Sequence, residues 1–182
     1  MEFFKVNVEV DQDGFIHNKY GGNANAEFLD EDSYPDFSPK ISWEKVPNAK
    51  SYALELIDYD SCPVIGKIFV HWIVGNIHST ILEENASRKN TDIIQGINSL
   101  TEGFLRSNID ESKKPQSNIK SSKYIGPMPP NGDHYYLFNV YALDIEKLDI
   151  KLPFFINDMH DAMRGHIVAL GRCEFKYKQC KK

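Results

Sequence analysis

The chain alternates between apolar and polar positions in several stretches, with the two-residue period of a β-strand. The stretch at residues 134–144 has apolar side chains on both faces, which is typical of a strand buried on both sides. A stiff loop with three prolines, residues 126–132, precedes it. The predicted strands are residues 2–10, 15–20, 40–43, 51–58, 69–77, 134–144 and 173–177. Because 182 residues suit one hydrophobic core, the pattern predicts a single mostly-β domain over residues 1–182.

A histidine interrupts the apolar stretch at residues 69–77. Strict alternation predicts that one face of this strand carries Phe69, His71 and Ile73, and the other Val70, Trp72 and Val74. A histidine inside so apolar a strand needs a hydrogen-bond partner or lines a cavity.

One stretch near the C-terminal end has the period of an α-helix instead. Its apolar positions follow an i, i+3, i+4, i+7 spacing, at Met159, Ala162, Met163, His166, Ile167 and Leu170. We therefore predict a helix that is capped by Asn157 or Asp158 and runs to about residue 170. The alternation of Cys173, Phe175 and Tyr177 predicts that a strand follows it.

Composition limits the class of partner. The chain has 26 acidic and 21 basic residues, a formal charge of −5, which argues against nucleic acid or an anionic membrane surface as the main partner. Its three cysteines lack the spacing of a disulfide framework or a zinc site, which fits a reducing compartment. No apolar run is long enough to span a bilayer. We expect a cytoplasmic protein with no cofactor, no membrane span and no nucleic-acid partner.

The candidate chemistry consists of carboxylates and imidazoles near strand ends. Asp58 and Asp60 follow one predicted strand, His71 lies in the next, and His134 begins another. If these strands are neighbours, the side chains meet at one edge of the sheet. A carboxylate beside an imidazole orients the ring and favours its charged form, which suits the binding of a phosphate or carboxylate head group. We place His134 at the rim of such a site, so that His134→Ala is expected to weaken anion binding and leave the fold intact.

Other interpretations of these residues stay open. The chain lacks the G-x-S-x-G, G-x-x-x-x-G-K-[ST], G-x-G-x-x-G and H-E-x-x-H motifs, so a standard serine hydrolase, NTPase, dinucleotide enzyme or zincin is not indicated. A hydrolase of a small phosphorylated or acylated substrate, with His71 or His134 as general base, is the first alternative. A protein-interaction module with a vestigial pocket is the second. A metal site is disfavoured, because the carboxylates can as readily hydrogen-bond the histidines.

Six segments carry a family resemblance. They are Phe37-Ser38-Pro39-Lys40-Ile41-Ser42-Trp43, Asp58-Tyr59-Asp60-Ser61-Cys62-Pro63, Phe69-Val70-His71-Trp72, Gln95-Gly96-Ile97-Asn98-Ser99, the loop 126–132 with the strand after it, and Gly165-His166-Ile167. The loop and strand resemble the signature G-P-x-P-P-x-G…H-x-Y-x-F…A-L-D. On these motifs the chain resembles the phosphatidylethanolamine-binding proteins, the family of Raf kinase inhibitor protein, and in particular their short bacterial-type branch.

The resemblance implies a fold and a site. The fold is a central antiparallel β-sheet with a second smaller sheet and one or two helices near the C-terminus. The site is a small pocket for phosphate or phosphoethanolamine-like lipid head groups. By motif, its walls are Asp58 and His71 on one side and His134 and Tyr136 on the other, with Pro129 and Pro130 as rim and Asp60 and Pro63 in the turn below. The resemblance also implies a binding protein that regulates a partner such as a kinase or protease, rather than an enzyme.

The sequence departs from the family pattern in three places. Tyr59 stands where the family has a proline, so the turn around Asp58 lacks a fixed φ angle. Tyr135 stands where an arginine commonly follows the histidine. Residues 103–123 read as an inserted flexible loop ahead of the signature, which is a lid, a partner-binding loop or a solvated loop.

Overall fold

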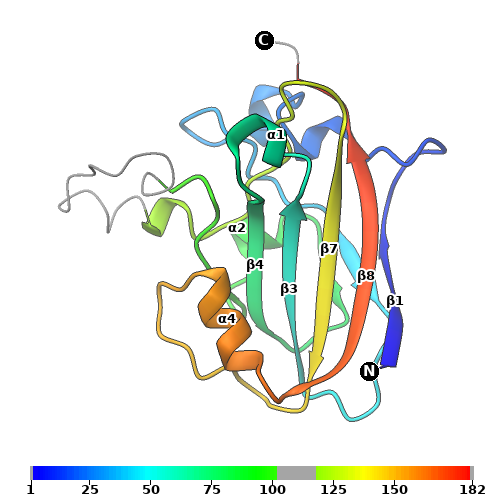
Figure 1. Cartoon of the computed structure of the whole chain (residues 1–182), viewed down its shortest axis with the longest axis vertical. Coiled ribbons are helices and arrows are strands. Elements are labelled where there is room, and N and C mark those ends of the chain that lie inside the picture. Colours follow the sequence, from blue (N-terminus) through cyan, green and yellow to red (C-terminus); the bar gives the residue numbers. More distant parts are fainter. Residues whose placement is uncertain (1, 102–117, 181–182) are drawn as a thin grey trace.

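One curled sheet of eight strands forms the frame of the protein (Figure 1). The computed structural model describes residues 2–101 and 118–180. The strands within these residues are β1 (Glu2–Val8), β2 (Ile41–Trp43), β3 (Ser51–Asp58), β4 (Phe69–Ile77), β5 (Ile81–Leu82), β6 (Ile94–Gln95), β7 (His134–Leu143) and β8 (Ile167–Tyr177). They lie in the order β5-β2-β1-β8-β7-β3-β4-β6.

The central part of the sheet is antiparallel, as predicted. Neighbouring strands from β8 through β7, β3 and β4 to β6 all pair antiparallel. The first strand, β1, pairs parallel with β8 and antiparallel with β2, which in turn pairs with β5, so these three strands form the smaller part of the sheet. The predicted mostly-β fold with few helices is confirmed.

The helices are short. They are η1 (Asn18–Tyr20), η2 (Ala26–Phe28), α1 (Cys62–Ile65), α2 (Ala86–Lys89) and α4 (Ile156–Met163). The predicted helix near the C-terminus exists as α4, but its predicted end near residue 170 is wrong. Gly165 has a φ of +84°, which turns the chain, and Ile167 and Leu170 pair with Leu143 and Tyr141 of β7. Backbone pairing with β7 along this stretch outweighs the helical spacing of these two residues.

The predicted strand at residues 15–20 is also wrong. Only Phe15 forms a bridge, to Lys176, and the chain then tightens into η1. The ring nitrogen Nδ1 of His17 accepts a hydrogen bond from the backbone N–H of Lys19 (3.1 Å), which favours the turn over an extended chain.

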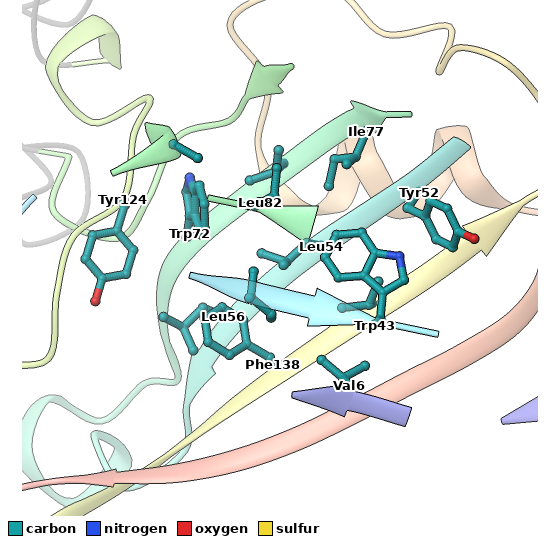
Figure 2. Packing of buried hydrophobic residues seen from close by; sticks show 14 of the residues in the cluster. Val6, Trp43, Tyr52, Leu54, Leu56, Trp72, Ile77, Leu82, Tyr124 and Phe138 are labelled. Atoms are coloured by element: carbon teal, nitrogen blue, oxygen red, sulfur yellow. The ribbon is translucent and has the colours of Figure 1, made fainter. Parts of the chain in front are cut away.

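Two groups of buried apolar side chains flank the sheet. The larger lies on the face where Leu54 and Leu56 of β3 meet Trp72 of β4 and Phe138 of β7, which Figure 2 shows together with Trp43 of β2. The smaller contains Met159 and Met163 of α4 and Ala53, Ile73, Leu143, Leu148 and Phe154. Every side chain of β3 is buried, because the strand separates the two groups.

Most of the predicted insertion at 103–123 lies outside the described residues. Its described end begins with one helical turn at residues 118–120. Lys123 Nζ then lies 2.7 Å from Asp30 Oδ2 and 3.1 Å from Asp36 Oδ2, so this end of the segment is fastened to the loop that precedes β2. No helix among residues 2–101 and 118–180 is long and apolar enough to cross a membrane.

Candidate functional site

A cavity of about 230 Å³ is lined by residues from the end of β3, the start of β7 and α1. Figure 1 shows that these elements meet at one end of the sheet. Its lining residues are Asp58, Ser61, Val64, Ile65, Phe69, His71, Ser99, Leu100, Met128, Pro129, Pro130, His134 and Tyr136. Six of the eight predicted site residues are therefore brought together: Asp58, His71, Pro129, Pro130, His134 and Tyr136. Strand pairing explains this, because β7 runs antiparallel to β3 with Tyr136 opposite Asp58.

Asp58 and His134 form a buried pair at the base of the cavity. Nδ1 of His134 lies 2.9 Å from Oδ2 of Asp58, and Nε2 of the same ring lies 2.7 Å from Oδ1 of Asn131. Both ring nitrogens are thus engaged within the protein. The His134 residue is only 4% exposed, so its predicted position at the rim is wrong. His134→Ala would leave Asp58 buried without its partner, which makes this substitution a poor test of binding alone.

His71 reaches the cavity through an irregularity in β4. Leu56 of β3 pairs with Trp72, but the next residue, Ile57, pairs with Val70, so His71 is an extra residue without a partner on β3. Such a β-bulge turns a side chain away from its alternating position. His71 therefore lies beside Tyr136, with ring centroids 5.2 Å apart, rather than on the face of Ile73 beneath α4. The prediction from strict alternation is wrong for His71.

The two nitrogens of His71 differ in their surroundings. Nδ1 donates to the carbonyl oxygen of Ile125 (2.7 Å), which places the proton of the neutral ring on Nδ1. Nε2 is buried, has no hydrogen-bond partner among the described residues, and lies 4.0 Å from Oδ2 of Asp58. Burial lowers the pKa of His71 to about 4; the Ile125 carbonyl and the Asp58 charge oppose this shift, and His134 adds to it. At neutral pH the ring is neutral and presents a lone pair at Nε2.

Tyr136 supplies a hydroxyl to the same space. Its ring stacks on Phe175 (centroids 5.4 Å apart), while its oxygen is buried without a full hydrogen bond to any described residue. Burial, with the nearby Asp58 charge, raises the pKa of Tyr136 far above its ordinary value. The hydroxyl therefore keeps its proton and can donate it in a hydrogen bond to a ligand.

This fold and site can be compared with known proteins. The sequence profile of the phosphatidylethanolamine-binding protein family matches residues 7–178. The chain belongs to this family. Protein YxkA of Bacillus subtilis, which is uncharacterized, is 35% identical over 168 residues, 90% of this chain and 94% of the relative. A UPF0098 protein of Methanothermobacter thermautotrophicus is 37% identical over 139 residues, 73% of this chain and 77% of the relative.

Solved structures of the phosphatidylethanolamine-binding protein family share the fold. A homologue from Chlamydia trachomatis superposes with a TM-score of 0.72 at 25% identity, and the match covers 99% of this chain and 100% of the homologue. YbcL of Escherichia coli superposes with a TM-score of 0.69 at 23% identity, over 98% and 99% of the two chains, which shows the fold alone. These bacterial relatives agree with the bacterial-type branch that the motifs indicated.

Two residues that the family motif suggested lie outside the cavity lining. Asp60 Oδ2 accepts a hydrogen bond from the backbone N–H of Tyr135 (2.8 Å) and so joins the end of β3 to the start of β7. Pro63 occupies the first turn of α1, where a backbone N–H has no acceptor within the helix. The proline therefore costs the helix no hydrogen bond. Both residues shape the turn that follows β3, and neither is among the lining residues of the cavity.

Ser61 takes over the role of the proline that Tyr59 replaces. Its backbone N–H donates to Asp58 Oδ1 (3.0 Å), and its hydroxyl donates to the carbonyl oxygen of Asp58 (2.7 Å). These bonds hold Asp58 in the cavity although Tyr59 leaves φ unconstrained. Neither Ser61 nor Asn131, which contacts His134, was predicted as a site residue, although both lie inside the family motifs.

Five other lining residues were not predicted as site residues. Ser99 and Met128 lie inside segments of the family motifs, Val64, Ile65 and Leu100 lie in none, and only the tertiary structure brings the five together. In the part of the chain that the structure describes, no three His, Cys, Asp or Glu side chains form a group that could hold a metal ion.

Proposed function

We propose that the protein binds small molecules with a phosphate-type or other anionic head group in the Asp58–His71–His134 cavity. The observation that carries the proposal is the ring nitrogen Nε2 of His71, which is buried in the cavity and lacks a partner among the described residues. Buried polar atoms normally have a hydrogen-bond partner, so one without a partner in a cavity points to a ligand. The Tyr136 hydroxyl beside it is also buried and interacts only weakly with Asp58.

The geometry favours a binding protein over a hydrolase. No described hydroxyl or thiol is hydrogen-bonded to Nε2 of His71, and both nitrogens of His134 are already engaged. A pKa of about 4 also makes His71 a weak base at neutral pH. The regulation of a partner protein, such as a kinase or protease, remains part of the proposal on the strength of the family resemblance, with the cytoplasm as the expected location.

The binding proposal predicts that two histidines respond together to a ligand. We expect inorganic phosphate and phosphoethanolamine to shift the ring-proton NMR signals of His71 and His134 saturably between roughly pH 5 and pH 8, the range of an ordinary imidazole. Because the pKa of His71 lies below this range, contact with the ligand would move its signals. His71→Ala should abolish these shifts. His78→Ala is the matched control, because His78 is exposed and lies outside the cavity. If no histidine signal moves, the pocket is not a binding site and the interaction-module interpretation gains.

Anion binding should strengthen as the pH falls. A fully ionised anion needs a proton on Nε2 of His71, but burial lowers the pKa of this ring to about 4. Sulfate keeps its charge between pH 7 and pH 5, so its affinity should rise by up to about tenfold per pH unit over this range. Isothermal titration calorimetry would measure it. His71→Ala should remove most of the dependence, and an affinity that is independent of pH would contradict the role given to His71.

A further inference from the structure

The polar end of the cavity is rich in hydrogen-bond acceptors. Oδ2 of Asp58 and Nε2 of His71 lie 4.0 Å apart, and each has a lone pair to offer. The hydroxyl of Tyr136, which keeps its proton, is a donor beside them. No lysine or arginine is among the residues that line the cavity.

This arrangement penalises an anion that carries no proton. Such an anion would face the negative charge of Asp58 and the lone pair of His71, and no lysine or arginine in the lining would offset them. The titratable groups that face His71 are Asp58 from β3 and His134 and Tyr136 from β7. The lining contributed by α1, residues 99–100 and residues 128–130 carries no charge that could compensate.

An anion with its own O–H group avoids the penalty. It can donate that proton to Nε2 of His71 and accept a hydrogen bond from Tyr136 through another oxygen. The phosphate monoester in its monoanionic form has this combination, since its second pKa lies near 6. A phosphate diester, such as the head group of an intact phospholipid, has one negative charge and no phosphate O–H.

We propose that the cavity selects phosphate monoesters in the singly protonated form over phosphate diesters. This inference rests on the proposed function and adds the class of ligand to it. The cavity volume of about 230 Å³ suits a small head group, and its apolar lining residues, including Val64, Ile65, Leu100 and Met128, suit the organic part of the ester.

The test compares two probes of equal charge. At pH 5, methyl phosphate and dimethyl phosphate each carry one negative charge, but only methyl phosphate has a phosphate O–H. Calorimetric titration should show methyl phosphate binding more tightly by several-fold or more, because the buried His71 ring is mostly unprotonated at pH 5 and dimethyl phosphate needs it protonated. Between pH 5 and pH 7, the affinity for dimethyl phosphate should fall throughout, whereas that for methyl phosphate should fall mainly above about pH 6.

Two variants distinguish the donation of the ligand's proton to His71 from anion binding in general. His71→Phe removes the acceptor and should abolish the preference between the probes. Tyr136→Phe removes only a hydroxyl that has no full partner in the protein, so it should keep the fold, weaken both probes by several-fold and preserve their ratio.

Each outcome decides a separate question. Equal affinity for the two probes overturns the selection and leaves the proposed function standing. Binding of ethylammonium in place of both probes also overturns it, because the donor would then be an ammonium group. If none of the probes binds, the proposed function itself fails.

Discussion

Gly126→Ala is expected to lower the free energy of unfolding by about 2–3 kcal/mol, because the site of the new methyl group is already filled by backbone. A Cβ atom at Gly126 would lie 2.2 Å from the carbonyl oxygen of Tyr20 and 3.0 Å from Cα of Gly21. The backbone N–H of Gly126 also donates to the carbonyl oxygen of Pro35 (2.6 Å), so the loop has no room to move away. Urea denaturation would measure the loss.

Gly132→Ala is the matched control at the other end of the same loop. No atom lies within 4 Å of a Cβ atom built there, and the glycine does not need a positive φ. We expect a change below about 0.5 kcal/mol, with a slight gain possible from reduced freedom of the unfolded chain. Equal stability of the two variants would show that the loop does not pack against residues 20–21 as described. Any Gly126→Ala protein that still folds should bind phosphate more weakly, since Pro129 and Pro130 follow in this loop.

Glu55→Ala is expected to cost about 3 kcal/mol, because it removes the acceptor of a buried network between β3, β7 and α4. Glu55 Oε1 accepts from Asn139 Nδ2 (2.7 Å) and from the Tyr141 hydroxyl (2.8 Å), and Oε2 lies 2.8 Å from Nε2 of His160. Burial alone would raise the pKa of Glu55, but these hydrogen bonds outweigh it and hold the pKa below its ordinary value. The hydrogen bond to Glu55 raises the pKa of His160.

The pH dependence of the stability lost in Glu55→Ala follows from the pKa shifts of Glu55 and His160. The lowered pKa of Glu55 makes its contribution complete above the unfolded value of 4.5, and it is lost as the pH falls through the folded pKa. The raised pKa of His160 makes its contribution complete below the unfolded value of 6.5, and it is lost as the pH rises through the folded pKa. The stability difference between wild type and Glu55→Ala should therefore be largest between these two values.

Asp144→Ala provides the comparison for Glu55→Ala. Asp144 Oδ1 lies 2.9 Å from Nδ1 of His166, a pair of the same kind, but both side chains are nearly half exposed. Water can replace this partner, so the expected loss is below about 1 kcal/mol. Chemical denaturation of both variants at pH 5.5 would compare them, and similar losses would rule out the special role given to the buried Glu55 network.

Most of the site residues could be identified from the family motifs in the sequence, but the contacts that surround them could not. Asp58, His71, His134 and Tyr136 were predicted to meet, and the pairing of β3 with β7 and β4 places them together. The burial of His134 and the outward position of Asp60 depend on contacts with Asn131 and Tyr135, whose places a linear pattern does not encode.

Local periodicity determined the strands β3 and β4, whose observed bounds match the prediction residue for residue. The prediction succeeded because a run of apolar residues bounded by turn residues is a property of consecutive positions. Periodicity failed at Ile167 and Leu170, because their spacing fits a helix as well as a strand. Only the pairing with β7 decides between the two. Periodicity also failed at His71, because the β-bulge arises from the register between β3 and β4 rather than from either strand alone. The sequence by itself therefore determined which side chains carry the chemistry. Only the tertiary structure decided that His71 lines a cavity and that its Nε2 is buried without a partner among the described residues.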